Sequence, residues 1–318
     1  MKKITAVFLA LILTMFSFTA CSAEPVYSGI ERTASAGVAA VTFNCAAPWG
    51  SLLKGTQSSA RVKKFAAYMN AVKPDFIGTQ EMNNDWLSEL SEQMADYEFY
   101  GVARGGDKNE KQSELNAVFW LKDKYTLIDS GTFWLSETPE KESRYTGAGC
   151  NRVCTWVLLQ NKETNAQYLH MNTHLDNMSE EAQGYGANVI LAEEQKLTAQ
   201  YPNAAVILTG DFNQTRGMRA HSAVSAVLND SLTAAESGEI KGTYQEWGEQ
   251  ENAEPIDFIF SSSDLTAVNY EVLDDLSNGY VSDHYGVYTE FVTVREQVMY
   301  KSVRGLLIFI LNHKIFNN

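Results

Sequence analysis

The stretch that most constrains the fold of this chain runs from Val206 to Asn213 and reads Val-Ile-Leu-Thr-Gly-Asp-Phe-Asn. Its first four residues are apolar or β-branched, which predicts a buried strand, and Gly210 predicts the end of that strand. Asp211 and Asn213 then follow at its rim. Mg²⁺ chemistry on phosphate uses carboxylate and carboxamide groups of this kind. Because Gly, Asp and Asn also favour turns, this stretch alone leaves a simple turn open.

Length and charge narrow the class of protein. The chain has 318 residues, of which 45% are hydrophobic, and this fits one soluble α/β domain. Its formal net charge is -14. A non-specific nucleic-acid binder needs Lys and Arg along one face, so this balance argues against tight DNA binding. It does not exclude nuclease chemistry, since a divalent cation can bring an anionic substrate to an acidic cleft.

The N-terminus predicts export. Lys2 and Lys3 precede an apolar run from Ile4 to Ala20, so residues 1–20 are interpreted as a signal peptide of the lipoprotein type. Cys21 is then the lipidated residue, residues 21–37 are a tether, and the protein is anchored in the cell envelope, at the membrane surface or in the periplasm. If Cys21 is not lipidated, plain cleavage gives a secreted protein, and an uncleaved membrane anchor is the remaining alternative.

Three further cysteines, Cys45, Cys150 and Cys154, predict no clear disulfide. An extended strand separates positions i and i+4 by about 13 Å, so Cys150 and Cys154 can pair only if the chain loops back between them. Free or partly paired thiols are the expectation.

Strands and helices alternate along the rest of the chain. Apolar, β-branched and aromatic runs predict the strands, and a spacing of three to four residues predicts the helices, with Asn84 and Ser179 as two of the caps. The expected strands cover residues 38–43, 75–81, 117–121, 125–135, 154–160, 167–173, 206–209, 255–260 and 287–294, and the expected helices cover 61–72, 84–94 and 179–199.

Polar residues of metal-binding or acid–base types lie at the ends of these strands. One such residue is ordinary turn material, and a single histidine is more often structural than catalytic, as we expect for His221. Eight together point to one rim of a sheet sandwich. They are Asn44, Glu81, His174, Asp211, Asn213, Asp257, Asp283 and His284.

With these residues in this order, the sequence resembles the endonuclease/exonuclease/phosphatase superfamily, the metal-dependent phosphohydrolases that include DNase I, and in particular a bacterial branch of it. The resemblance covers residues 38–294 and implies a four-layer α/β sandwich, in which two mixed β-sheets pack face to face with helices outside. The matching pieces are Asn44, Gln80-Glu81, Asn172-Thr173-His174-Leu175-Asp176, Gly210-Asp211-Phe212-Asn213, Ile256-Asp257 and Ser282-Asp283-His284.

The resemblance also implies a metal site and a site for the attacking water. Glu81, assisted by Asn44 and Asp283, would hold Mg²⁺ or Mn²⁺ through oxygen ligands suited to a hard cation. Asp211 and Asn213 would position the water and the phosphate, with Asp211 as a candidate second-metal ligand or base.

The remaining implied roles concern the histidines and one arginine. His284 would act on the nucleophile or the phosphate, while Asp257 accepts from its other ring nitrogen. His174 would hydrogen-bond a phosphate oxygen or help the leaving group, with Glu114 as its orienting carboxylate. Arg152 would contact the substrate phosphate.

The sequence therefore predicts an exported, Mg²⁺-dependent, monomeric phosphohydrolase that cleaves phosphodiester or phosphomonoester bonds. Nucleic acid, a phospholipid head group, as in a sphingomyelinase-like phospholipase C, and a sugar or inositol phosphate remain open as substrates. A non-catalytic surface binding lipoprotein on the same scaffold is the alternative from another class. The tail, residues 295–318, has no assigned role.

Overall fold

The computed structural model describes residues 24–33, 37–47, 58–106, 113–235, 239–250 and 254–293. The predicted signal peptide, Cys21 and the tail at 295–318 lie outside the described residues. Within them, none of the helices combines the length and the apolar character needed to cross a membrane.

Two six-stranded sheets form the centre of the molecule. The first has the strand order β11-β12-β1-β2-β4-β3, and the second has the order β5-β6-β7-β8-β10-β9. The strands of the first sheet are β1 (Val38–Asn44), β2 (Phe76–Gln80), β3 (Tyr97–Tyr100), β4 (Val118–Leu121), β11 (Leu265–Leu273) and β12 (Gly286–Thr293). Those of the second are β5 (Tyr125–Trp134), β6 (Val153–Asn161), β7 (Gln167–His174), β8 (Ala204–Asp211), β9 (Asn229–Asp230) and β10 (Asp257–Ser261).

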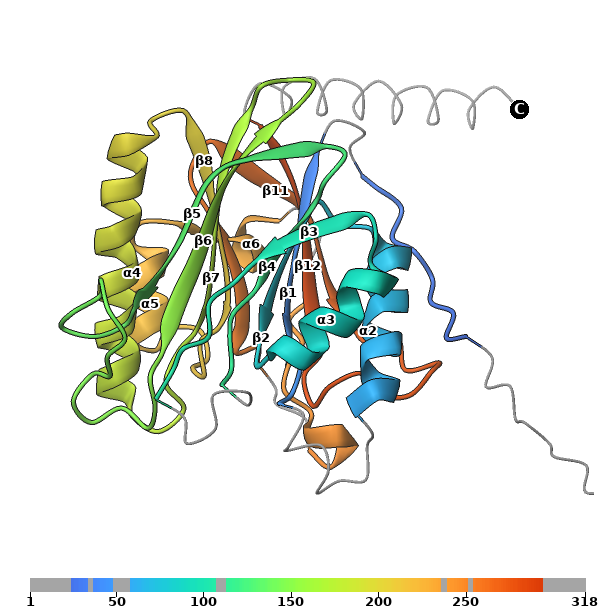
Figure 1. The fold of residues 1–318 in the computed structure, drawn as a ribbon, viewed down its shortest axis with the longest axis horizontal. Helices are drawn as coiled ribbons and strands as arrows, with labels where there is room; N and C mark the ends of the chain where they lie inside the picture. The colour runs from blue at the N-terminus through green and yellow to red at the C-terminus, as the bar shows by residue number, and fades with distance from the viewer. Residues whose placement is uncertain are drawn as a thin grey trace, which may run out of the picture.

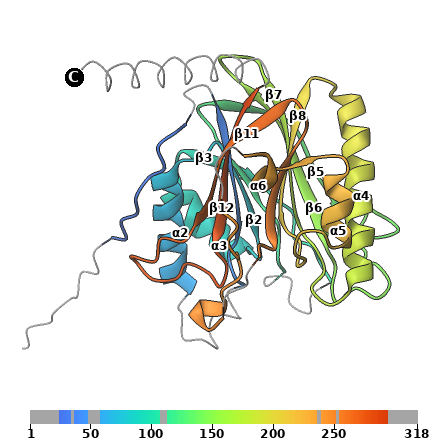
Figure 2. The same cartoon turned by 180° about the vertical axis from the view of Figure 1, so that it is seen from behind.

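Helices cover the outer faces of both sheets (Figure 1). α2 (Ser58–Val72) and α3 (Asn84–Gln93) lie on the first sheet, and α4 (Glu180–Gln200) and α5 (Arg219–Ser225) lie on the second, as the reverse view also shows (Figure 2). A short helix, α6 (Ser231–Ala234), and a 3₁₀ turn, η2 (Glu246–Gly248), complete the set. The predicted four-layer α/β sandwich is confirmed.

Alternation along the strands builds three apolar cores. In β1, Ala39, Val41 and Phe43 belong to the core beneath α2 and α3. Val38 and Ala40 belong instead to the core between the two sheets. Successive side chains of a strand point to opposite faces, so a strand covered on both faces is apolar throughout. This explains why β1 and β8 read as continuous apolar runs.

Strand pairing brings the polar strand ends to one edge. β1 and β2 are parallel, with Asn44 opposite Gln80, and β7 and β8 are parallel, with His174 opposite Asp211. β10 runs antiparallel to β8, and so its first residue, Asp257, lies opposite Asp211. β12 begins at this edge too, because it is antiparallel to β1 and pairs Val287 with Thr42.

Several local features differ from the sequence-based expectations. β3 and β11 were not expected, and Asn83 rather than Asn84 caps α3, accepting from the backbone of Trp86 at 3.0 Å. Residues 24–33 of the predicted tether contact the domain. Tyr27 stacks on Tyr68 with ring centroids 4.2 Å apart, and both side chains are buried.

The described cysteines are free thiols, namely Cys45, Cys150 and Cys154.

Candidate active site

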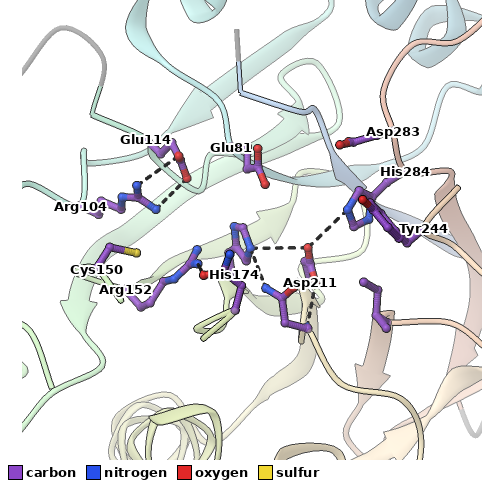
Figure 3. A pocket seen from close by; sticks show the side chains of 13 residues that line it. Glu81, Arg104, Glu114, Cys150, Arg152, His174, Asp211, Tyr244, Asp283 and His284 are labelled. Carbon is purple, nitrogen blue, oxygen red and sulfur yellow. Dashed lines mark hydrogen bonds and ion pairs between the residues drawn. The ribbon is translucent and has the colours of Figure 1, made fainter. Parts of the chain in front are cut away.

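A polar cavity of about 400 Å³ opens at the edge where the strands end. Figure 3 shows Arg104, Glu114, Cys150 and Arg152 at one end of it, Tyr244, Asp283 and His284 at the other, and Glu81, His174 and Asp211 between. Eight of the predicted site residues line this cavity, and Asn44 and Asp257 do not. The complete lining is Glu81, Arg104, Glu114, Cys150, Arg152, His174, Asn177, Asp211, Asn213, Tyr244, Ile256, Asp283 and His284.

Asp211 is the centre of the cavity's hydrogen-bond network. Its Oδ2 accepts from Asn44 Nδ2 at 2.9 Å, and Nε2 of His174 and Nε2 of His284 lie 3.5 and 3.8 Å from the same oxygen. Its Oδ1 accepts from the backbone N–H of Asn213 at 2.8 Å. Four residues therefore surround one buried carboxylate in a defined orientation.

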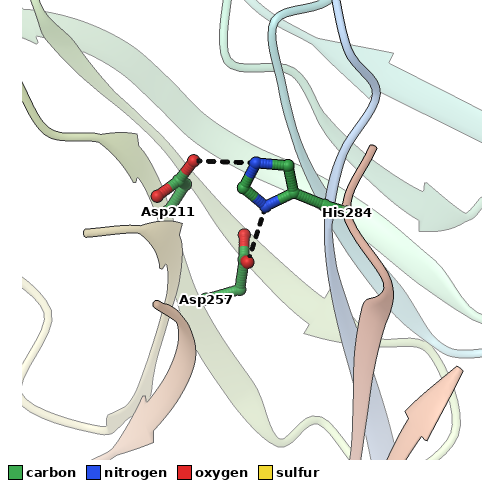
Figure 4. Close-up of side chains that lie close together, drawn as sticks. All are labelled: Asp211, Asp257 and His284. Carbon is green, nitrogen blue, oxygen red and sulfur yellow. Dashed lines mark hydrogen bonds and ion pairs between the residues drawn. The ribbon is translucent and has the colours of Figure 1, made fainter. Parts of the chain in front are cut away.

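His284 bridges two carboxylates, as Figure 4 shows. Its Nδ1 lies 2.8 Å from Oδ2 of Asp257 and its Nε2 points to Asp211. Burial alone would lower the pKa of His284, but the charges of Asp257, Asp211 and Asp283 raise it to about 10. The imidazole is therefore positively charged at neutral pH, as a proton donor to a phosphate oxygen requires.

His174 has the opposite character. Its Nε2 lies 3.0 Å from Nδ2 of Asn213, whose amide also donates to the carbonyl of Leu175 at 3.1 Å. Burial, together with the charges of Arg152, Arg104 and His284, holds the pKa of His174 well below its ordinary value. His174 is thus neutral at pH 7.

The expected contact between His174 and Glu114 is not made. Glu114 forms two hydrogen bonds with the guanidinium of Arg104, at 2.7 and 3.1 Å, and among the described residues Nδ1 of His174 has no hydrogen-bond partner. A guanidinium fork matches both oxygens of a carboxylate, and this bidentate geometry outcompetes a single bond to a neutral imidazole.

The predicted metal ligands lie at the acidic side of the cavity. Glu81, at a positive φ of 58°, accepts from Asn44 Nδ2 at 3.1 Å and from the backbone of Ala47 at 2.7 Å. Asn44 does not line the cavity. Its amide nitrogen joins Glu81 to Asp211, and its oxygen accepts from Ala46 at 3.0 Å. Asn44 therefore orients carboxylates in this structure, and Glu81 and Asp283 face the cavity.

The charge state of these carboxylates fits a divalent cation. Burial and the charge of Asp257 raise the pKa of Asp211 to about 7, and burial raises that of Asp283. Oδ1 of Asp257 lacks a hydrogen-bond partner within the described part of the chain. Such shifts mark carboxylates whose negative charge is poorly compensated, and hard oxygen donors suit Mg²⁺ or Mn²⁺.

A second group of ligand atoms is also close enough to hold a metal. One atom each from Asp211, Asp257 and His284 lie within 4.8 Å of one another. The hydrogen bond between Asp257 and His284 already uses two of these side chains. Glu81 and Asp283 are not hydrogen-bonded to each other, so their oxygens are available to a cation. This favours Glu81 and Asp283 over the second group as the cation ligands.

The other end of the cavity holds two arginines, of which Arg104 is paired with Glu114. Arg152 is 7% exposed, and its guanidinium donates to Asn177 at 3.2 Å and lies 3.9 Å from Asp176. Arg104, Cys150, Asn177 and Tyr244 were not expected at the site. Asn177 follows directly after the Asn172–Asp176 stretch, and this adjacency was a usable signal. Tyr244 reaches His284 through an isolated bridge between loops, which leaves no periodic pattern in the sequence.

Comparison with known proteins identifies the family. Residues 41–284 match the profile of the Endonuclease/Exonuclease/phosphatase family. The chain belongs to the endonuclease/exonuclease/phosphatase family. Its membership and fold make it a phosphoester hydrolase by class.

Solved structures agree with this family. A mannosyl-6-phosphatase of Bacteroides thetaiotaomicron VPI-5482 is 28% identical, with a TM-score of 0.74 over 80% of this chain and 99% of that one. A functionally unknown conserved protein of Enterococcus faecalis V583 is also 28% identical, with a TM-score of 0.73 over 80% and 100% of the two chains. The catalytic domain of human Nocturnin shares the fold at 19% identity, with a TM-score of 0.65 over 81% and 95%. No curated protein matches the sequence significantly.

Proposed function

We propose that this member of the endonuclease/exonuclease/phosphatase family is a Mg²⁺- or Mn²⁺-dependent phosphatase for small phosphomonoesters such as sugar phosphates. The carrying observation is the cavity itself, where Asp211 meets one positively charged and one neutral histidine, between an end with Glu81 and Asp283 and an end with two arginines. A volume of about 400 Å³ suits a small ligand. The similarity to a mannosyl-6-phosphatase and the net charge of -14 support a sugar phosphate over a polynucleotide.

Glu81 and Asp283 would hold the divalent cation, which when bound supplies a positive charge for the phosphoryl oxygens. Asp211 orients the attacking water and accepts its proton at Oδ2, an oxygen that Asn44 keeps in place. A carboxyl whose pKa lies near neutrality is suited to this task.

The histidines and Arg152 act on the other side of the phosphate. His284 donates from Nε2 to a phosphoryl oxygen, while Asp257 holds the opposite nitrogen. Arg152 adds a second positive charge, and Asn213 donates to Nε2 of His174 and so fixes this neutral ring beside the cavity. As the bond from phosphorus to the leaving oxygen breaks, that oxygen takes its proton from solvent. Negative charge that develops on the phosphate is thus met by groups already in position.

Location and assembly belong to the same proposal. The signal-like N-terminus supports export and a lipid anchor at Cys21, which would place the domain at the membrane surface or in the periplasm as a monomer. Phosphomonoesters outside the cytoplasm would then be its substrates.

A substrate panel tests the proposal. Mannose 6-phosphate, an inositol phosphate, bis-p-nitrophenyl phosphate, sphingomyelin and single-stranded DNA are each incubated with the protein and Mg²⁺. Release of phosphate, of p-nitrophenol, of phosphocholine or of shortened DNA is followed for the respective substrate. We expect the highest kcat/KM on a phosphomonoester and its loss in His284→Ala. The matched control is His221→Ala, since His221 also pairs with an aspartate, Asp230, at 3.2 Å but lies outside the cavity.

Each alternative has its own result in this panel. Preferred cleavage of the diester or of DNA would replace the phosphatase proposal with a phosphodiesterase, and preferred cleavage of sphingomyelin would indicate a phospholipase C. The absence of turnover on every substrate would favour the binding lipoprotein.

A further inference from the structure

Arg61 is a buried arginine close to the acidic side of the cavity. It lies in α2, is 1% exposed, and directs its guanidinium to backbone carbonyl oxygens. One terminal nitrogen donates to Cys45 at 2.5 Å and to Val281 at 3.1 Å, and the other donates to Ala46 at 2.9 Å. A fully buried charge is rare in proteins, so its contacts indicate a specific task.

The loop after β1 connects Arg61 to two predicted metal-site residues. The carbonyls of Cys45 and Ala46 accept from Arg61, while the N–H of Ala46 donates to Asn44 at 3.0 Å and that of Ala47 donates to Glu81 at 2.7 Å. Ala46 has a φ of 54°, in the left-handed region that disfavours a side chain. External hydrogen bonds are needed to keep a non-glycine residue there.

The segment before β12 gives the second connection. Val281 accepts from Arg61 and lies two positions before Asp283. Thus one planar group joins the segments that carry Asn44 and Asp283, and through Ala47 it reaches Glu81.

Two aromatic rings pack against the guanidinium group of Arg61 and help to fix its orientation. Its central carbon lies 4.8 Å from the ring centroid of Trp86 in α3 and 5.4 Å from that of Trp247 in η2. Burial lowers the pKa of Arg61 to about 10, while the negative charges of Asp283 and Glu81 oppose this shift. Arg61 is therefore charged at neutral pH.

We infer that Arg61 is a positioning residue for the divalent-cation site, because it holds the loop after β1 and the segment before β12 at the spacing in which Glu81 and Asp283 share the cavity. The inference rests on the proposed metal-dependent function. It assigns the arginine a geometric role that lysine cannot fill, since a single ammonium cannot serve three carbonyls from one plane and pack against two indoles.

Binding of Mn²⁺, measured by electron paramagnetic resonance without substrate, tests this role. We expect Arg61→Lys to raise the Kd for Mn²⁺ by about tenfold or more, as is usual when a group that orients metal ligands is removed. Arg61→Met should also weaken binding, although it removes a positive charge near the cation. Thermal unfolding of the metal-free proteins is measured alongside.

Arg32→Lys is the matched control. Arg32 pairs with the buried Asp75 at 2.8 Å and donates to two backbone carbonyls, but it lies near the start of β1, away from the cavity. Its replacement should lower the melting temperature and leave the Kd for Mn²⁺ unchanged.

Four results would overturn the inference. The first is an unchanged Kd for Mn²⁺ in Arg61→Lys. The second is tighter Mn²⁺ binding in Arg61→Met, which would show that the charge of Arg61 matters more than its geometry. The third is a loss of Mn²⁺ affinity in Arg32→Lys equal to that in Arg61→Lys. In the fourth, the wild-type protein binds no Mn²⁺, and this alone also removes the proposed metal dependence. If the Arg61 variants do not fold, Trp247→Leu decides, because removing the half-buried indole should weaken Mn²⁺ binding in the same direction, and an unchanged Kd rejects the role.

Discussion

His174 and His284 approach the same oxygen of Asp211 but differ in charge. The carboxylates around His284 raise its pKa to about 10, whereas burial and nearby cations keep His174 neutral. Environments that push two titratable groups apart commonly mark the division between proton donor and acceptor. At this site the division follows from which residues face each ring: Asp257 for one, and Arg152 and Arg104 for the other.

The contact between Asp257 and His284 gives the first prediction. In Asp257→Asn the hydrogen bond to Nδ1 loses its charge and the imidazolium loses its main counter-ion, so kcat should fall by about 10²- to 10⁴-fold with a smaller change in KM. Steady-state kinetics on the preferred substrate measure this.

Asp230→Asn is the control for that substitution. Asp230 holds His221 in a similar pair, but also caps α6 through a bond to Leu232 at 3.0 Å that asparagine can keep. A fall in kcat of similar size in both variants would mean that Asp257 acts through stability rather than through His284.

At the scale of elements, two pairs of parallel strands explain why the site forms. Parallel neighbours end at the same edge, so β1 with β2 and β7 with β8 each deliver two polar ends together. Close approach of the sheets then joins the two pairs. Gln80 donates to Asn172 at 2.7 Å across the interface, and Asn172 donates to the carbonyl of Thr79 at 2.8 Å.

Gly78 permits this close approach and gives the second prediction. A Cβ at Gly78 would lie 2.0 Å from Oγ1 of Thr209 and 2.6 Å from Oδ1 of Asn172. Gly78→Ala should therefore lower the free energy of unfolding by about 1–3 kcal/mol. Urea denaturation of the wild type and the variant measures this loss of unfolding free energy. Gly101→Ala, whose added methyl would first meet the flexible Leu115 side chain at 3.1 Å, should cost less. The reverse order would contradict the account of this interface.

Asp75 links strands of both sheets and gives a prediction about pH. It accepts from the N–H of Ala39, from Arg32 and from Tyr125, at 2.8, 2.8 and 3.0 Å, and from Lys124 at 2.5 Å. Burial alone would raise the pKa of Asp75. The positive charges of Arg32 and Lys124 lower it by more than burial raises it, so the net shift of the pKa is downward. Asp75→Asn should cost about 2–3 kcal/mol at pH 7, because hydrogen bonds to a charged group are lost.

That cost should shrink in acid. A carboxyl with a lowered folded pKa stabilises the fold fully above the unfolded value of about 4, and its contribution is lost as the pH falls through the lower folded value. The difference in unfolding free energy between wild type and Asp75→Asn, measured at pH 7 and in increasingly acidic buffers, should decrease downward from about pH 4. A constant difference would contradict the charged role of Asp75.

Two strands absent from the sequence-based expectations, β3 and β11, share a physical cause. β3 and β11 are the two edge strands of the first sheet. β3 has only four residues, and β11 carries a bulge between Ala267 and Asn269 and alternates buried with partly exposed positions. Short or irregular edge strands give weak hydrophobic patterns. The central strands, buried on both faces, gave strong ones.

At the scale of the whole molecule, the sequence was enough to predict which polar residues meet. Asp211, His174, His284 and Glu81 converge because His174 and Asp211 end strands, Glu81 follows one, and His284 lies just before β12. Some contacts at the site were not predictable in the same way. Arg104 takes Glu114 away from His174 through side-chain competition, and Tyr244 arrives from a loop, so neither is encoded in a periodic pattern.

The central claim is that this convergence makes a cation-dependent phosphoester hydrolase. It is tested most directly by the initial rate of phosphate release from mannose 6-phosphate after dialysis against EDTA, with Mg²⁺ then added back, for the wild type and for Asp211→Asn. We expect the dialysed wild type to be inactive and to regain saturable activity with Mg²⁺, and Asp211→Asn to stay inactive at every Mg²⁺ concentration. Turnover that survives EDTA unchanged, or that Asp211→Asn retains in full, would contradict the claim.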